Sequence, residues 1–336
     1  MKIVFLTRLF YPDIGGVEKH VLEIGKRMVK DGHKVLVITE SKGEGREVME
    51  GVEIRRVRTP SNWFKKFYIW IWLLRSRKYI READIIHAHD VYYWYFPLRF
   101  IYPGKKSFIT FHGYESYPIK KRAIMVRKIS EKLSNGNIIV GDFIKKWYGT
   151  KPNFVIYGGV DSPAKYVKPG TKDSALFIGR LDEQTGIMDY ANAVDLITEK
   201  IKDFKFTIIG DGEFTQRLSR YRPLGFKPNP EAYFKSHNFA FVSRYLTVLE
   251  ALANQRLVFA LYDNPVKEDY LKMSPFSRFI VIENNSERLA EKVLEYLRND
   301  DMSKKMVEEG YKWVKTQTWD GVVDKYYRLW GLTSLK

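Results

Sequence analysis

Two side chains suited to binding a ligand directly follow apolar runs of this sequence. Arg180 comes just after residues 175–178, and a guanidinium placed there can hold a phosphate through two parallel hydrogen bonds. His112 follows residues 108–111 in the same way. Ligands of open parallel sheets gather outside the carboxyl ends of the strands, so both positions indicate a ligand site. A surface salt bridge is the alternative for Arg180.

Glu250 stands inside an almost wholly apolar helical segment, residues 246–253. A carboxylate is costly to bury unless it accepts hydrogen bonds, and a pair of ligand hydroxyls could supply them. A partly exposed or internally capped glutamate is the alternative.

The glycine pair Gly15 and Gly16 lies between the first apolar run and a segment with helical periodicity. Glycines at the start of a helix let the backbone approach a ligand, and the exposed N–H groups there favour an anion such as phosphate. An ordinary strand-to-helix turn is the alternative, because the three-glycine spacing of the dinucleotide fingerprint is missing.

Histidines and an aspartate gather near the end of another apolar run. His87, His89 and Asp90 could ligate a metal, but a structural role is favoured without a further ligand cluster. The sequence has no cysteine, which excludes disulfides, thiolate nucleophiles and cysteine-based metal sites. We therefore expect no metal site.

The elements that must position these residues alternate between strand and helix. Short apolar runs occur in both halves of the chain, at residues 3–6, 35–38, 85–87, 108–111, 138–140, 154–157, 175–178, 206–209, 239–242, 258–261 and 279–282. Segments with helical spacing separate several of them; one has Val17, Val21, Ile24 and Met28 on one face. This alternation predicts parallel sheets covered by helices on both faces, an α/β fold.

A chain of 336 residues exceeds the size of one hydrophobic core, so two domains are expected. We predict a Rossmann-like first domain over residues 1–162, a second over 173–316, and a final helix within 317–336. That helix carries Val323, Tyr326, Tyr327 and Trp330 at helical spacing and needs a surface to cover, for which the first domain is one candidate.

Composition limits the partners. Apolar residues make up 45% and charged residues 29%, which is typical of a globular protein. The net charge of +17 would attract phosphates, anionic lipids or nucleic acid, but no nucleic-acid-binding motif is present. No apolar run is long enough to span a bilayer or act as a secretory signal, so we expect a cytoplasmic protein. Abundant Lys, Arg and Glu without Cys suit a thermophile.

An aromatic and basic segment at residues 63–78 could bind a membrane surface. Aromatic side chains flanked by cations lie well at a lipid headgroup boundary; a helix that packs in the core with a solvated basic edge is the alternative. The residues concerned are Trp63, Lys65, Lys66, Trp70, Trp72 and Arg75.

In their order along the chain, these motifs resemble glycosyltransferase family 4, the retaining glycosyltransferases with two Rossmann-like domains that face each other across a cleft (GT-B architecture). The resemblance covers nearly the whole chain. It rests on residues 15–18, 86–89, 110–112, 157–161, 179–181, 209–212 and 249–251.

The resemblance implies a hexosyltransferase-type activity that moves a sugar from a UDP- or GDP-sugar to a hydroxyl of a glycan or lipid-linked acceptor. It implies that Arg180 holds the donor diphosphate and Glu250 the ribose, and that His112 lies beside the transferred sugar. Gly15, Gly16 and Gly210 would complete the donor site. The family generally requires no metal or other cofactor, because protein cations and helix amides stabilise the departing diphosphate. A peripheral position at the inner face of the membrane would suit such an acceptor.

Two departures from the family pattern keep a second hypothesis open. Where the family has a lysine five residues after its arginine, this chain has Thr185, and the first glutamate, eight residues before Glu250, is replaced by Val242. A catalytically reduced homologue that binds nucleotide sugars or acts as a scaffold is therefore the alternative. Arg244 or Lys267 could replace the lost cation. A sugar-phosphate epimerase or phosphorylase on the same architecture is a third class.

Overall fold

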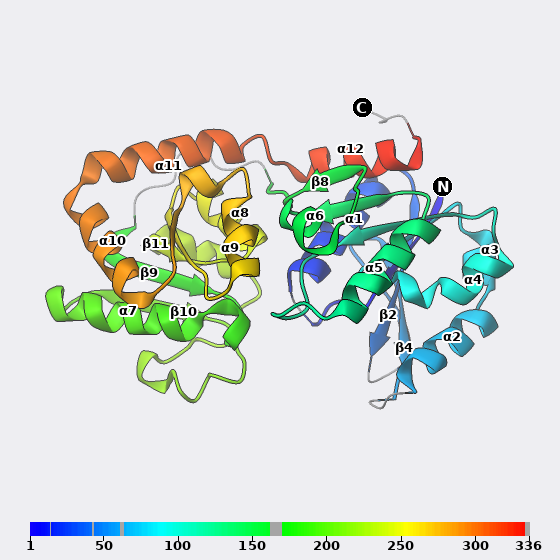
Figure 1. The fold of residues 1–336 in the computed structure, drawn as a ribbon, viewed down its shortest axis with the longest axis horizontal. Coiled ribbons are helices and arrows are strands. Elements are labelled where there is room, and N and C mark those ends of the chain that lie inside the picture. Colours follow the sequence, from blue (N-terminus) through cyan, green and yellow to red (C-terminus); the bar gives the residue numbers. More distant parts are fainter. Residues whose placement is uncertain (14, 42–43, 61–63, 162–169, 333–336) are drawn as a thin grey trace. The chain divides into compact units, whose positions relative to one another are not determined.

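The chain forms two compact units in a computed structural model (Figure 1). Unit 1 comprises Met1–Ile156 and the chain from Trp319 onward, and unit 2 comprises Tyr157–Thr318. The structure describes all residues except 14, 42–43, 61–63, 162–169 and 333–336.

The described part of unit 1 contains an eight-stranded sheet in the order β3-β4-β2-β1-β5-β6-β7-β8. The strands are β1 (Lys2–Thr7), β2 (Lys34–Ser41), β3 (Gly45–Met49), β4 (Val52–Arg58), β5 (Ile85–His89), β6 (Lys106–Phe111), β7 (Asn137–Val140) and β8 (Phe154–Ile156). Every pairing is parallel except that of β3 with β4. The all-parallel expectation therefore misses β3, whose surface-facing residues carry no apolar run.

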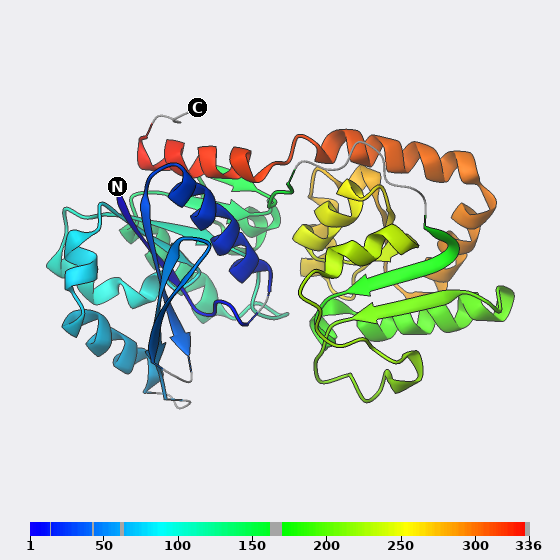
Figure 2. The ribbon, with the colours of Figure 1, turned by 180° about the vertical axis from the view of Figure 1, so that it is seen from behind.

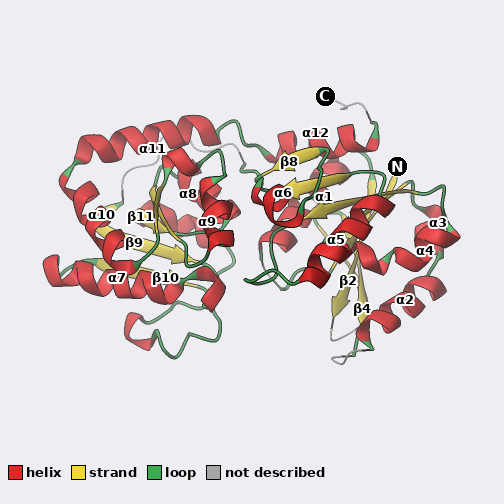
Figure 3. Ribbon diagram, in the orientation of Figure 1, coloured by secondary structure: helices red, strands yellow, loops and turns green. Residues whose placement is uncertain are grey.

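Helices cover this sheet on both sides, as Figure 3 shows. They are α1 (Gly16–Lys30), α2 (Lys65–Arg75), α3 (Lys78–Glu82), α4 (Phe96–Ile101), α5 (Lys121–Leu133), α6 (Phe143–Tyr148) and α12 (Trp319–Trp330), with a 3-10 turn η1 (Tyr92–Trp94). The final helix, α12, packs along α1 (Figures 1 and 2). Its aromatic face, Tyr326, Tyr327 and Trp330, is buried there.

Unit 2 has a five-stranded sheet in the order β10-β9-β11-β12-β13, and all its pairings are parallel. The strands are β9 (Thr171–Ile178), β10 (Lys205–Ile209), β11 (His237–Phe241), β12 (Leu257–Leu261) and β13 (Val281–Glu283). The helices are α7 (Ile187–Lys200), α8 (Tyr245–Ala253), α9 (Pro265–Lys272), α10 (Ser286–Arg298) and α11 (Asp300–Val314). Short 3-10 turns are η2 (Glu183–Thr185), η3 (Ser219–Tyr221), η4 (Pro230–Ser236) and η5 (Ser277–Phe279). The predicted α/β class with two parallel-sheet units is confirmed.

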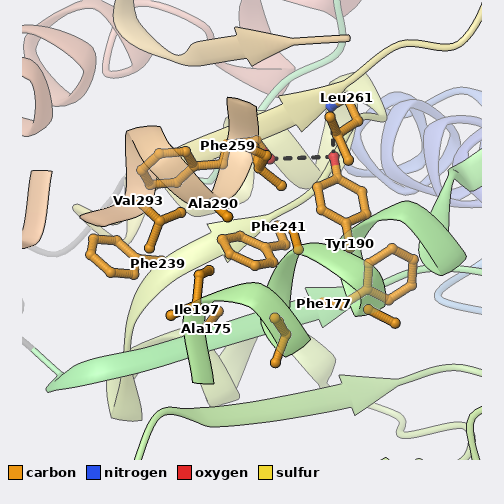
Figure 4. Close-up of a cluster of buried hydrophobic side chains, with 14 of the residues drawn as sticks. Ala175, Phe177, Tyr190, Ile197, Phe239, Phe241, Phe259, Leu261, Ala290 and Val293 are labelled. Atoms are coloured by element: carbon orange, nitrogen blue, oxygen red, sulfur yellow. Dashed lines mark hydrogen bonds between the residues drawn. The ribbon is translucent and has the colours of Figure 1, made fainter. Parts of the chain in front are cut away.

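Strand geometry explains the core of unit 2. Successive strand residues point to opposite faces of a sheet, so alternate residues share one face. Phe241 and Phe259 pack with Tyr190 of α7 in a buried cluster (Figure 4). The Tyr190 hydroxyl donates to Phe259 O at 3.3 Å and accepts from Leu261 N at 2.9 Å, which ties α7 to β12. This core holds the carboxyl ends of the strands, and hence the loops that follow them, in fixed positions.

Candidate active site

Three histidines of unit 1 gather at the carboxyl edge of its sheet. His89 ends β5, His112 follows β6 directly, and His20 lies on α1. His89 Nδ1 and His112 Nε2 are 2.9 Å apart and share a hydrogen bond. The rings of His20 and His112 meet edge to face at 4.8 Å between centroids. With His87, which lies two residues earlier on β5, these residues form the histidine cluster of unit 1.

Helix α12 completes the cluster from the other end of the chain. The hydroxyl of Tyr326 lies 2.9 Å from His20 Nε2 and 2.8 Å from Thr110 Oγ1. Thr110 in turn bonds His87 Nε2 at 2.8 Å, and Trp330 Nε1 donates to His87 Nδ1 at 3.1 Å. The four imidazoles are thus held in fixed orientations by a buried hydrogen-bond network.

Burial keeps the histidine cluster neutral. It lowers the pKa of His20, His87 and His89 well below the ordinary value, since an imidazolium is costly to desolvate. The pKa of His112 falls to about 3, first because of burial and then through its electrostatic interactions with His87 and Arg127. At neutral pH the imidazole of His112 can therefore orient a hydroxyl by hydrogen bonding without carrying a charge.

Among the described residues, three of these histidines come nearest to a metal-binding arrangement. One nitrogen each from His20, His89 and His112 lies within 4.8 Å of the others. Neutral imidazoles are suitable zinc ligands, which would need a nitrogen at about 2.0–2.1 Å from the ion. In this structure a hydrogen bond joins His89 Nδ1 to His112 Nε2, so two of the three imidazoles are bonded to each other. Asp90 does not join it and instead accepts from His112 N at 2.9 Å.

A buried arginine shapes the loop that carries His112. Arg127 of α5 donates to Gly113 O at 2.5 Å and pairs with Glu115 at 2.9 Å. Its guanidinium lies 3.9 Å from the centre of the Tyr148 ring, a cation–π contact. Gly113 has φ +153, a backbone conformation that suits glycine. These contacts fix the backbone next to His112.

The glycine pair lies where helix α1 begins. Gly15 is its N-cap, with extended backbone, and Gly16 is its first residue. A Cβ on Gly15 would come 2.6 Å from Glu18 Oε2, the end of a flexible side chain that can move aside. The helix start presents backbone N–H groups at the edge of the sheet where the histidine cluster lies, as an anion site requires.

In unit 2 the predicted donor residues follow neighbouring strands. Arg180 comes after β9, where its side chain is 62% exposed and its Nε pairs with Asp182 at 3.2 Å. Glu250 is half-buried on α8, which follows the adjacent strand β11. The start of α8 touches the turn after β9, because Ser243 Oγ donates to Thr185 O at 3.3 Å. Tyr245 is the first residue of α8, and Glu250 lies five residues later, about 7.5 Å along the helix axis from that start.

Gly210 has a packing role that its position after β10 explains. Its φ is +144, and a Cβ there would lie 1.8 Å from Gly179 O. Gly179 N donates to Ile209 O at 3.0 Å, so the turns after β9 and β10 run side by side. Any residue other than glycine would push apart the backbone that carries Arg180.

The aromatic and basic segment of unit 1 divides into buried and exposed faces. Trp70 Nε1 donates to Tyr93 O at 2.9 Å, Trp72 stacks on Tyr79, and Lys65 pairs with Glu40 at 2.5 Å. Lys66 lies over the Tyr93 ring, Arg75 is exposed at the end of α2, and Trp63 lies outside the described residues. The exposed apolar side chains of this region are Phe64, Phe67, Tyr68 and Ile71, with Phe100 and Ile101 on α4. None of the described helices is long and apolar enough to cross a membrane.

Sequence reasoning missed His20 and Tyr326. His20 lies between Val17 and Val21 on the predicted inner face of its helix. A polar residue on that face was the one sequence signal that could have pointed to His20. Nothing local indicates that a residue 306 positions away bonds to it.

Two family models match the chain in succession. The model described as Glycosyltransferase Family 4 matches residues 14–162, and that of the Glycosyl transferases group 1 matches residues 161–313. Together with the two parallel-sheet units, they define a glycosyltransferase with the GT-B fold. The chain belongs to glycosyltransferase family 4.

Three similar proteins illustrate this assignment. An uncharacterized glycosyltransferase of Methanocaldococcus jannaschii is 27% identical over 95% of each chain. GDP-mannose:cellobiosyl-diphosphopolyprenol alpha-mannosyltransferase of Xanthomonas campestris is 23% identical, over 62% of this chain and 60% of that protein. HepE of Anabaena, crystallised with UDP-glucose, shares the fold with a TM-score of 0.69 and 13% identity, over 98% of each chain.

Proposed function

We propose that this glycosyltransferase moves a hexose from a UDP- or GDP-sugar to a hydroxyl acceptor with retained anomeric configuration. The observation that carries the proposal is the placement of Arg180 and Glu250 in unit 2. They follow the adjacent strands β9 and β11, at the edge of the sheet where ligands of such folds bind. The GDP-mannose and UDP-glucose in the names of two similar proteins support a nucleotide sugar as donor.

Each residue has one task in this proposal. Arg180 holds the diphosphate, whose negative charge grows as the bond to the sugar breaks. Glu250 accepts hydrogen bonds from the ribose hydroxyls. The N–H groups at Gly15 and Gly16 add partial positive charge for the phosphates, and the neutral His112 orients a sugar hydroxyl. No metal has a role in this scheme.

The reaction exchanges one bond for another at the anomeric carbon. The acceptor oxygen forms a bond to that carbon on the face from which the diphosphate leaves, and the carbon–oxygen bond to the diphosphate breaks. The acceptor proton passes to an oxygen of the leaving diphosphate. The products are the glycosylated acceptor and a nucleoside diphosphate.

A thermal-shift panel of nucleotide sugars tests the donor assignment, because a ligand that binds only the folded state raises its melting temperature. We expect one class of donor to raise it, and Arg180→Ala and Glu250→Ala to abolish the rise. A panel without any shift would favour the alternative, a scaffold that has lost its donor site. The connection of only three residues between β11 and α8 is the feature that favours that alternative.

We further propose that unit 1 binds an anionic membrane surface, where a lipid-linked acceptor would lie. On α2, Phe67 and Ile71 are 50% and 49% exposed on one face, and on the contacting helix α4 Phe100 is 73% exposed. Lys66 and Arg75 flank this apolar face, as anionic headgroups require.

Sedimentation with phosphatidylglycerol vesicles tests the membrane proposal. The double variant Phe67→Ser/Ile71→Ser should lose binding. Val48→Ser is the matched control, since Val48 is 65% exposed on β3 and lies outside the apolar face. Equal binding of both variants would exclude this surface.

A further inference from the structure

Three cationic side chains of unit 2 converge on one neutral residue, Gln184 in the turn after β9. Arg180 and Arg244 direct their Nη2 atoms at Gln184 Oε1, at 3.4 and 3.2 Å. Lys267 Nζ donates to Gln184 O at 2.8 Å. The cations follow three different strands, β9, β11 and β12, so the sheet itself brings them together at its carboxyl edge.

The carboxylates of Asp182, Asp189 and Asp263 lie in the neighbourhood of Lys267. Arg180 pairs with Asp182, but no ion pair joins Arg244 or Lys267 to a carboxylate in the part of the chain that the structure describes. The like charges of Arg244 and Lys267 repel each other, and the charge of Arg244 accordingly lowers the pKa of Lys267. A ligand with several anionic oxygens would relieve this repulsion and give each cation a charged partner.

Lys267 is the unusual member because it is buried. It is 2% exposed, in the first turn of α9, and its backbone N–H is fixed by Asn264 Oδ1 at 3.0 Å. Burial first, and then the charge of Arg244, lower its pKa to about 8. The start of a helix is also unfavourable for a cation, since the helix dipole is positive there. A lysine at this position therefore costs stability and needs another explanation.

Thr185, in the turn after β9, cannot supply a positive charge in place of Lys267. The hydroxyl of Thr185 lies 2.8 Å from both Arg180 O and Asp182 O, turned toward the backbone. An ammonium has three N–H donors, and the contact of Lys267 with Gln184 uses one of them.

We infer that Lys267 is a phosphate-binding residue of the donor site, where its ammonium acts with Arg180 and Arg244 on the diphosphate of the nucleotide sugar. This inference rests on the proposed function for the identity of the ligand. Lys267 on α9 thus provides the positive charge that is absent from the turn after β9, where Thr185 stands in place of the family's lysine.

Calorimetric titration with UDP, GDP and inorganic pyrophosphate tests the inference. Lys267→Met keeps a similar volume in the buried site but removes the charge. We expect it to weaken binding of pyrophosphate, and of the nucleotide that binds, by about 10- to 100-fold. Lys272→Met is the matched control, because Lys272 is exposed on the same helix and pairs with Glu268. It should bind as the unchanged protein does.

Proton uptake at pH 8 gives a readout that a structural role would not change. An anion raises the pKa of Lys267, so binding takes up a fraction of a proton, which titrations in two buffers of different ionisation enthalpy measure. The charged groups that face Lys267 are Arg244, Asp182, Asp189 and Asp263. Lys267→Arg should bind the ligand without uptake, because an arginine does not titrate here.

The outcomes separate this inference from the proposed function. If Arg180→Ala weakens binding and Lys267→Met does not, the inference is wrong and the donor site stands. If pyrophosphate binds through Lys267 but neither nucleotide binds, the inference stands and the nucleotide-sugar proposal is wrong. Uptake that persists in Lys267→Arg contradicts the inference even if Lys267→Met fails to fold.

Discussion

Removing one hydroxyl from α12 should destabilise unit 1 more than its size suggests. Tyr326→Phe leaves the ring in place but removes the oxygen that lies 2.9 Å from His20 Nε2 and 2.8 Å from Thr110 Oγ1. Both partners are buried. Thr110 keeps His87 as a partner, whereas His20 Nε2 is left without this one. Removing one partner of a hydrogen bond so that a buried group is left unpaired costs about 1–3 kcal/mol, so we expect a loss of about 2 kcal/mol.

Urea unfolding followed by circular dichroism measures this loss as a shift in the transition of unit 1, with unit 2 as the internal reference. Tyr327→Phe is the matched control, since its hydroxyl bonds Asp31 Oδ2 at 2.9 Å in a partly solvated place. It should cost about 1 kcal/mol or less. Equal losses in the two variants, or a loss below about 0.5 kcal/mol for Tyr326→Phe, would refute the reasoning.

Two further predictions concern pH and backbone. The histidine cluster stays neutral when folded but takes up protons when unfolded below about pH 6.5, so its contribution to stability is complete above that pH and is lost as pH falls. With four imidazoles, the free energy of unfolding should fall by roughly 5 kcal/mol between pH 6 and pH 5; urea midpoints that do not change over this interval would contradict it. Gly210→Ala should destabilise unit 2 by roughly 3 kcal/mol or more, because its Cβ would lie 1.8 Å from Gly179 O; a thermal-melt transition of unit 2 like that of the unchanged protein would exclude this close approach.

The strands were predictable because parallel strands covered on both faces are continuous apolar runs. Residues 108–111 and 175–178, for example, lie within β6 and β9. Strand β3 (Gly45–Met49) was missed because it pairs with β4 at the edge of the sheet and lacks such a run. At the start of β13 the predicted strand began too early, since Phe279 belongs to the preceding 3-10 turn.

The positions of candidate site residues in the fold were predictable where strand order alone determines them. Arg180 and His112 follow strands, so the sheet determines the edge at which they lie. The convergence of Lys267 on Gln184 could not be predicted, because it depends on the position of α9 relative to a turn 83 residues earlier. Tyr326 and His20 meet for the same kind of reason, across the whole length of the chain.

Release of nucleoside diphosphate in the presence of donor and acceptor tests the central claim most directly. The proposed mechanism predicts release that requires a UDP- or GDP-sugar together with a glycan or lipid-linked acceptor, with the sugar recovered on that acceptor, and its loss in Arg180→Ala. Release at the same rate in Arg180→Ala, or without sugar on the acceptor, would contradict it.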